Sequence, residues 1–305
     1  MATELNTRME PEFRSGIVCL VGRPNVGKST LLNRLVGKPV SITANKPQTT
    51  RNRIMGVRHG PGCQVVFVDT PGLHQAFSPL NRRMVGYALK ALDDADLVVM
   101  VAEAGVGAAE EERWVLERVI KAAAAKFLVL NKIDRVPEAA VLESLRRFGA
   151  MDAFSEWIPV SALTGRGVER LAGLIESRLQ PGPPYFEPDQ ITDQSEASLM
   201  AELVRQEVFR RTRQEVPYKT AVRVERIEEG KGRLIVDAVI VVERATQKGI
   251  LIGKGGKMLK SIGSEARKKI ERLLGIPIYL ALHVRVVSSW SERAGTLTEM
   301  GYPEP

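Results

Sequence analysis

Cysteine is scarce in this sequence, and long apolar runs are missing from it. The two cysteines among 305 residues, Cys19 and Cys63, cannot build a disulfide framework and lack the spacing of a metal site. No apolar run approaches the roughly 20 residues that cross a bilayer. Charges scattered through residues 1–14 leave no apolar core for a signal peptide. We therefore expect a cytoplasmic protein in a reducing environment, with any membrane contact limited to a peripheral one on the cytoplasmic face of the cell membrane.

Acidic residues are outnumbered by basic ones in the last third of the chain. From Ala197 to the C-terminus, 20 Lys and Arg stand against 13 Asp and Glu, so this part carries +7 of the net charge of +8. A length of 305 residues suits two domains. A nearly neutral first domain and a basic second domain suggest an anionic polymer as partner, although a merely solvated surface can carry the same charge.

The most specific motif is G-x-x-x-x-G-K-S at residues 22–29, GRPNVGKS. An apolar stretch at 17–21 precedes it and a helix-like stretch at 30–36 follows, which is the context of a phosphate-binding loop. Its glycines let backbone N–H groups wrap a polyphosphate. Lys28 adds a charge at the β/γ-phosphates, and Ser29 offers a hydroxyl to Mg²⁺. The nucleotide contacts predicted from this motif are Gly22, Asn25, Val26, Gly27, Lys28, Ser29 and Thr30.

A second motif follows an apolar strand expected at residues 65–68. This is D-x-x-G, formed by Asp69, Thr70, Pro71 and Gly72. At a strand end it supplies an aspartate for the magnesium shell and a glycine N–H for the γ-phosphate. Asp-x-Pro-Gly also makes an ordinary turn, so the motif is weak by itself.

Two further motifs concern the base of the nucleotide. A second apolar strand, at 127–130, ends at N-K-x-D, with Asn131, Lys132 and Asp134. A carboxylate can accept hydrogen bonds from both the ring N–H and the exocyclic amine of guanine, a donor pair that adenine lacks. We therefore predict that Asp134 selects guanine. The next motif, Ser161, Ala162 and Leu163, is predicted to close over the base, although a helix cap before Gly165 is an alternative interpretation.

The set of motifs GRPNVGKS, DTPG, NKID and SAL resembles those of the translation-factor-related GTPases. The sequence DTPGLH at residues 69–74 narrows the resemblance to the Era GTPases. Residues 41–51, here called the switch segment, are similar to the first switch of that family. The resemblance implies a threonine that closes on Mg²⁺ when GTP is bound. Thr50 is our assignment, with Thr49 as the alternative. Both threonines could also be ordinary β-residues, because polar β-branched pairs suit strands.

The residue after the DTPG motif bears on the rate of hydrolysis. Ras-like enzymes place a glutamine there to orient the attacking water, but this chain has Leu73, so we predict slow intrinsic hydrolysis. Gln75 lies two positions too late, and His74 is either a base or a solvated histidine of a mobile loop. The resemblance implies K⁺ held beside the phosphates by Asn25. The predicted catalytic residues are Asn25, Lys28, Thr50 and Gly72, and the predicted Mg²⁺ ligands are Ser29, Thr50 and Asp69.

Proline and glycine mark a boundary between domains at residues 180–188, QPGPPYFEP, which reads as a stiff linker. Before it, strand and helix patterns alternate, which is typical of a doubly wound α/β domain. We predict a disordered N-terminus at 1–15 and a P-loop GTPase domain with a mostly parallel sheet at 16–180. A linker at 181–196 and a smaller α+β domain at 197–305 complete the chain.

The second domain reads as a helix at 198–214, strands at 220–228 and 234–243, a glycine loop, an amphipathic helix and a last strand at 278–287. The loop sequence I-G-x-G-G before a basic helix is the signature of a KH module, here in type II order, although a plain tight turn is the alternative. Few aromatic residues accompany it, so bases are expected to rest on apolar side chains. The predicted RNA contacts are Ile252, Gly253, Lys254, Gly255, Gly256, Lys257 and Lys260.

The resemblance to the Era GTPases covers residues 16–302. It implies a GTP-switched RNA-binding protein that assists assembly of the small (30S) ribosomal subunit, whose KH domain holds the 3′ end of 16S rRNA. Two alternatives remain: a GTPase of another class, acting in tRNA modification or on membranes, and an RNA-binding module with an inactive nucleotide site. Relatives that modify tRNA carry a catalytic cysteine in the tail, whereas this chain has none after Cys63. The intact nucleotide motifs argue against an inactive site.

Overall fold

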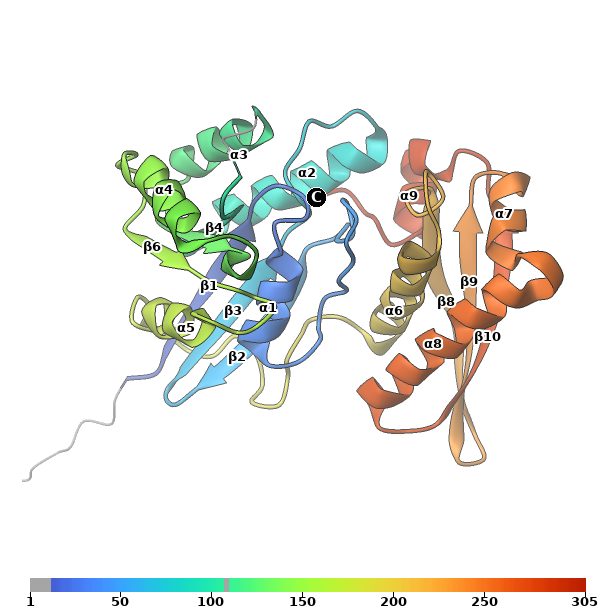
Figure 1. Cartoon of the computed structure of the whole chain (residues 1–305). Helices are drawn as coiled ribbons and strands as arrows, with labels where there is room; N and C mark the ends of the chain where they lie inside the picture. The colour runs from blue at the N-terminus through green and yellow to red at the C-terminus, as the bar shows by residue number, and fades with distance from the viewer. Residues whose placement is uncertain (1–11, 107–109) are drawn as a thin grey trace, which may run out of the picture.

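The computed structural model describes residues 12–106 and 110–305, which form two bodies side by side (Figure 1). Each body is a sheet with helices packed on it, and the connection between them passes below α1 and reaches α6 in the view of Figure 1. The C-terminal residues return from the second body toward α2 of the first. Within the described ranges, every helix is too short or too polar to cross a membrane.

The first sheet has the strand order β2-β3-β1-β4-β5-β6, with the short β7 paired to β1. Its neighbouring strands are parallel except for β2, which is antiparallel to β3, and β7, which is antiparallel to β1. The prediction of a mostly parallel, doubly wound P-loop fold is therefore confirmed. The elements are β1 (Arg14–Val21), α1 (Lys28–Val36), β2 (Ile54–Gly60), β3 (Cys63–Asp69), α2 (Pro79–Asp93), β4 (Leu97–Glu103), α3 (Glu110–Lys121), β5 (Ala125–Asn131), α4 (Glu138–Gly149), β6 (Glu156–Pro159), α5 (Val168–Glu176) and β7 (Gln180–Pro181).

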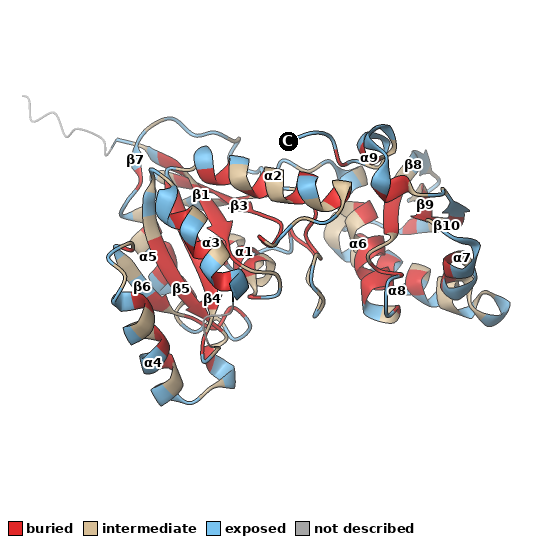
Figure 2. Cartoon of the chain, turned by 90° about the horizontal axis from the view of Figure 1, so that it is seen from above, coloured by how far each residue is buried: buried red, intermediate tan, exposed pale blue. Residues whose placement is uncertain are grey.

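Both faces of this sheet are buried, which explains the continuous apolar runs of its strands. Alternate residues of β1 point to opposite faces. Val18 and Leu20 join the core under α1 and α5, whereas Cys19 and Val21 join the core under α2, α3 and α4. Figure 2 shows these strands buried along most of their length.

The expectation of disorder over residues 1–15 falls largely on residues 1–11, which lie outside the described residues. It is wrong for the last two, because Arg14 and Ser15 begin β1 and pair with Cys63 and Gln64. The backbone hydrogen bonds of the neighbouring strand β3 extend β1 beyond its apolar run.

The predicted linker is held against the first sheet. The Gln64 side-chain oxygen accepts from the N–H groups of Tyr185 and Phe186 at 2.7 and 3.0 Å. Farther along, Val57 N–H donates to the Ile191 carbonyl at 2.9 Å, beside a bridge between Gly56 and Thr192. The segment therefore follows the outer side of β2.

The second sheet has the order β10-β9-β8, with β10 parallel and β8 antiparallel to β9. Helices α6, α7 and α8 pack on one face, and η3 and α9 cover one end of the other face. This is the predicted KH fold. Its elements are α6 (Glu196–Arg211), β8 (Thr220–Gly230), β9 (Arg233–Val242), α7 (Ala245–Ile252), η2 (Lys254–Gly256), α8 (Lys257–Leu274), β10 (Ile278–Val286), η3 (Trp290–Glu292) and α9 (Ala294–Glu299).

Two helices differ from the expectation. Helix α6 begins at Glu196 rather than 198, because the Ser195 hydroxyl caps it by accepting from Ser198 N–H at 3.2 Å. Helix α7 is not predicted by the sequence, since Gly249 and β-branched residues lower its helix propensity. It forms because Gln247 accepts from two backbone N–H groups at its start and Leu251 is buried in the core.

Candidate nucleotide-binding site

The four predicted motifs meet at one edge of the first sheet, because each follows the carboxyl end of a parallel strand. They follow β1, β3, β5 and β6 and line a cavity of about 460 Å³. Part of the switch segment, residues 42–45 and 48–50, closes another side. The predicted residues that line the cavity are Asn25, Gly27, Lys28, Ser29, Thr30, Thr50, Gly72, Asn131, Lys132, Asp134, Ala162 and Leu163. Those that do not appear in its lining are Gly22, Val26, Asp69, Thr70, Pro71 and Ser161.

The phosphate-binding loop is held in shape by contacts within the protein. Gly27 has φ +102°, and an added Cβ would lie 2.2 Å from Nδ2 of Asn131, so only glycine fits. The ammonium group of Lys28 donates to the carbonyls of Gly22 and Arg23 at 3.1 and 3.0 Å. Burial lowers the pKa of Lys28 to about 8, opposed by the carboxylate of Asp69. An incoming polyphosphate would add negative charge beside this buried amine and so stabilise its charged form.

Hydroxyl and carboxylate oxygens converge beside Lys28. The Ser29 hydroxyl donates to Oδ2 of Asp69 at 2.6 Å and lies 2.8 Å from Oγ1 of Thr50. Burial raises the pKa of Asp69, opposed first by the charge of Lys28. Oδ1 of Asp69 is buried without a hydrogen-bond partner in the described part of the chain. A set of hard oxygen donors with one unsatisfied carboxylate oxygen fits Mg²⁺.

The geometry distinguishes the two candidate threonines of the switch segment. Thr50 Oγ1 lies 2.8 Å from Oγ of Ser29 and 3.3 Å from Oδ2 of Asp69. Thr49 Oγ1 instead donates to the Lys46 carbonyl at 2.8 Å, within its own segment. The structure therefore brings Thr50, and not the hydroxyl of Thr49, to the predicted metal ligands.

At the end of the cavity away from Lys28, the side chains of Asn131 and Asp134 are held by hydrogen bonds. Asn131 Nδ2 donates to the Val26 carbonyl at 2.8 Å, and its Oδ1 accepts from Ala162 N–H at 2.9 Å. One side chain thus joins the phosphate-binding loop to the SAL motif. The Ser161 hydroxyl donates to Oδ1 of Asp134 at 2.6 Å, which fixes that carboxylate at the cavity wall.

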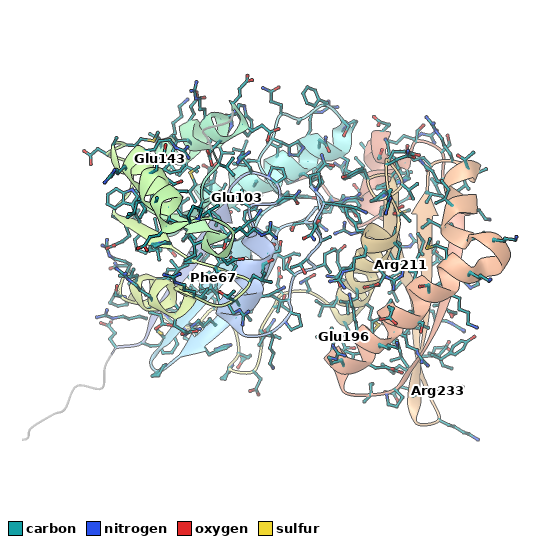
Figure 3. The ribbon with its side chains drawn as sticks, viewed as in Figure 1. Phe67, Glu103, Glu143, Glu196, Arg211 and Arg233 are labelled. Atoms are coloured by element: carbon teal, nitrogen blue, oxygen red, sulfur yellow. The ribbon has the colours of Figure 1, made fainter. Side chains whose placement is uncertain are left out.

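Two further residues hold predicted site residues in place, and the sequence does not predict either of them. Ser41 donates to Oδ2 of Asp69 at 2.9 Å. Glu103, labelled in Figure 3, accepts from the Lys132 ammonium group at 2.6 Å and holds that side chain. Ser41 begins the switch segment but is not among its predicted ligands, and Glu103 belongs to no motif. A serine in an irregular segment or a glutamate at a strand end cannot be singled out from one sequence.

The residues after the DTPG motif do not reach the cavity. Leu73 is fully buried, and its N–H donates to the Gly22 carbonyl at 3.1 Å. Nδ1 of His74 lies 2.7 Å from the Gly72 carbonyl, and its Nε2 lies 3.4 Å from Nε2 of Gln48. His74 is absent from the cavity lining, so its position favours a contact between loops over a role as base.

The predicted RNA loop lies in the second domain, between α7 and α8. Gly253 has φ +69°, and an added Cβ would lie 2.8 Å from Cβ of Met258. Lys254, Gly255, Lys257 and Lys260 are exposed, whereas Ile252, Gly253 and Gly256 are half-buried. Backbone N–H groups at the start of α8 and three exposed ammonium groups therefore lie together, which suits a phosphate backbone.

Known proteins resemble both parts of the chain. Residues 17–132 match the family of 50S ribosome-binding GTPases, and residues 215–291 match the KH domain family. The proteins called GTPase Era of Geotalea uraniireducens and Geobacter metallireducens are 49% and 50% identical to this chain over 294 and 292 residues. These matches cover 96% and 95% of this chain and 99% and 98% of the relatives.

Two solved structures of Era also resemble this chain over most of its length. Era in complex with MgGDPNP and nucleotides 1506–1542 of 16S ribosomal RNA matches with TM-score 0.92 and 37% identity, covering 95% of this chain and 99% of that chain. A variant of Aquifex aeolicus Era bound to GDP·AlF4⁻ matches with the same TM-score and identity, covering 95% and 100%.

Replacing Gly72 by alanine tests how closely the DTPG motif must approach the phosphate-binding loop. An added Cβ would lie 2.6 Å from the backbone nitrogen of Pro24, so the two loops must separate. We expect the affinity for a non-hydrolysable nucleoside triphosphate to fall about tenfold, or ~1.4 kcal/mol, in calorimetric titration. Gly173→Ala in α5 is the matched control, because a Cβ there meets nothing within 4 Å. Equal affinities of the two variants would contradict this interpretation.

Proposed function

The chain belongs to the Era family of GTPases, and we propose that it binds GTP with Mg²⁺ and uses the energy of that binding to control an RNA-binding KH domain. Its RNA would be the 3′ end of 16S rRNA, and its role the assembly of the small (30S) ribosomal subunit. The observation that carries the proposal is the convergence of four nucleotide motifs on one cavity in a chain that also presents a basic glycine loop.

The proposal includes a division of the chain. Residues 16–180 would form the GTPase domain, 181–196 the linker and 197–305 the RNA-binding domain. Matches to GTPase Era over 95% or more of the chain support both domains acting together, and they do not favour a GTPase of another class. The convergence of hydroxyls and a carboxylate suited to magnesium argues against an inactive site.

Each group at the phosphate end has a proposed task. Ser29, Thr50 and Asp69 would hold Mg²⁺, which neutralises charge on the β- and γ-phosphates. Lys28 would contact the same phosphates, and Gly72 N–H would face the γ-phosphate. Leu73 is buried and supplies no group to orient water, which supports slow intrinsic hydrolysis. Asn25 is exposed at the cavity with φ +64° and would help to hold K⁺ beside the phosphates.

A cytoplasmic location is part of the proposal, with a peripheral contact at the cytoplasmic face of the membrane. The net charge of +8 supports that contact, because anionic lipid headgroups attract basic surfaces. The same charge supports binding to RNA.

Exchanging Asp134 for asparagine tests the choice of base. The amide can donate to the 2-oxo group of xanthine, whereas the carboxylate can only accept, so preference should move from GTP to xanthosine triphosphate. Ser161 can still donate to the asparagine oxygen, which preserves the wall of the cavity. Competition titrations would measure both affinities, with the exposed Asp152→Asn as control. Retention of the GTP preference by Asp134→Asn would remove Asp134 from this role.

Exchanging the cation tests the K⁺ site. We expect the rate of GTP hydrolysis in K⁺ to exceed the rate in Na⁺ by roughly tenfold at equal ionic strength. This factor corresponds to a difference of about 1.4 kcal/mol in the activation barrier. Asn25→Gly should abolish the difference, since glycine accepts the positive φ without strain and removes only the side chain. Single-turnover rates in both salts are the measurement. A cation difference that persists in Asn25→Gly would place K⁺ elsewhere.

Replacing Lys254 and Gly255 by aspartate tests the RNA loop. The change adds repulsion where a phosphate backbone must pass. Nothing lies within 4 Å of a Cβ on Gly255, but its φ of +60° strains any side chain placed there. We expect affinity for single-stranded RNA to fall by an order of magnitude or more, ~1–3 kcal/mol per lost contact, with GTP affinity unchanged.

The matched control is the same double replacement at Lys231 and Gly232, in the exposed turn between β8 and β9, where a Cβ also meets nothing within 4 Å. RNA titration at fixed salt compares the two variants. Equal losses in both would mean that net charge, and not the loop, governs binding.

A further inference from the structure

The switch segment is held by the second domain as well as by the nucleotide cavity. Two side chains of α6, which spans Glu196 to Arg211 as labelled in Figure 3, reach its backbone. Arg205 donates to the Thr49 carbonyl, and Gln206 donates to the Thr43 carbonyl at 2.9 Å. In return, Lys46 of the switch segment donates to backbone carbonyls at the end of α6. The conformation of the switch segment is therefore restrained by the second domain.

The two ends of this region are fixed by the linker. Gln194 Nε2 donates to the Val40 carbonyl at 2.8 Å, one residue before the segment. Met55 N–H donates to Asp193 Oδ1 at 3.2 Å, and its carbonyl accepts from the Thr192 hydroxyl at 2.7 Å. Both anchor points lie outside the nucleotide cavity, so they restrict the segment without contacting a ligand.

Arg51 makes the deepest of these contacts. It is only 2% exposed, and its guanidinium donates to the carbonyls of Thr220, Tyr218 and Pro217 at 2.8, 2.8 and 3.1 Å. The ring of Phe209 lies 5.7 Å from the guanidinium carbon.

No carboxylate forms an ion pair with Arg51 in the part of the chain that the structure describes. Burial lowers the pKa of Arg51. Its charge is therefore compensated by peptide carbonyls and aromatic faces of the second domain, an arrangement that is lost if the guanidinium moves.

Thr50 and Arg51 are consecutive residues that face opposite partners. Thr50 Oγ1 lies 2.8 Å from Oγ of Ser29, and the next side chain ends in the second domain. One peptide unit joins the two residues. If Arg51 moves away from the three carbonyls that it contacts, we therefore expect Thr50 to be displaced from the predicted magnesium ligands.

We propose that Arg51 is a positioning residue for the GTPase reaction, through which the second domain holds Thr50 at Mg²⁺ and the γ-phosphate. The inference rests on the role given to Thr50 in the proposed function. Preorganising the segment lowers the entropy lost when a triphosphate binds. The effect is specific to the triphosphate, because the γ-phosphate is the group that Thr50 would meet. By linkage, a triphosphate that fixes Thr50 also favours docking of Arg51.

The test compares full-length variants for affinity toward GDP and the non-hydrolysable analogue GDPNP, with Mg²⁺, and for single-turnover hydrolysis of GTP. Arg51→Ala should lower the GDPNP affinity about tenfold, slow hydrolysis and leave the GDP affinity within about twofold. Arg51→Lys should lie between it and the wild type, because lysine keeps a donor but loses the planar fork. Arg53→Ala is the matched control, since Arg53 is exposed two residues away.

A double mutant separates positioning from general stability. If Arg51 acts through Thr50, adding Arg51→Ala to Thr50→Ala should cause no further loss of GDPNP affinity. Thermal unfolding checks each variant, and Arg51→Lys carries the comparison if Arg51→Ala does not fold.

The outcomes are distinct. Normal GDPNP affinity in the Arg51 variants, alongside a loss in Thr50→Ala, would overturn the inference and leave the proposed function intact. Equal losses for GDP and GDPNP, or additive losses in the double mutant, would also overturn it. Normal GDPNP affinity and hydrolysis in Thr50→Ala would overturn both the role of Thr50 and the inference that rests on it.

Discussion

The buried carboxylate of Asp69 is the group on which the arrangement of the nucleotide cavity depends. A buried charge must be compensated, and here the compensation comes from the nearby Lys28 and three hydroxyl groups. Those hydroxyls belong to Ser29 at the start of α1 and to Ser41 and Thr50 in the switch segment. One carboxylate at the end of β3 therefore draws together the phosphate-binding loop and both ends of the switch segment, which lie 19 to 40 residues before it in the sequence.

The sequence predicts the first domain well because its motifs are short and its topology is strongly constrained. Strand and helix patterns that alternate require a parallel sheet, and parallel strands place the residues after their carboxyl ends at one edge. Lys28, Asp69, Asn131 and Asp134 can thus be assigned to one edge of the sheet from their motifs alone. Ser41 cannot, because its contact with Asp69 depends on the path of a segment that has no regular structure.

Contacts across long separations explain most of what the sequence does not reveal. Arg51 meets the carbonyl of Thr220, 169 residues later, and an arginine is normally read as a surface residue. Helix α7 escapes prediction for a related reason: its local propensity is low, and burial of Leu251 in the core stabilises it. The glycine loop after α7 is predictable, because the conformation of Gly253 is one that only glycine adopts readily.

The linker has a consequence beyond joining the domains. β2 is an edge strand, and an open edge offers free N–H and C=O groups to strands of other molecules, the first step of aggregation. The hydrogen bonds of Ile191 and Thr192 occupy part of that edge. At the edge of the second sheet, β8 has instead an irregularity between Val224 and Arg226 and a run of charged side chains. Detaching the linker would therefore endanger solubility, even in a protein whose two domains remained folded.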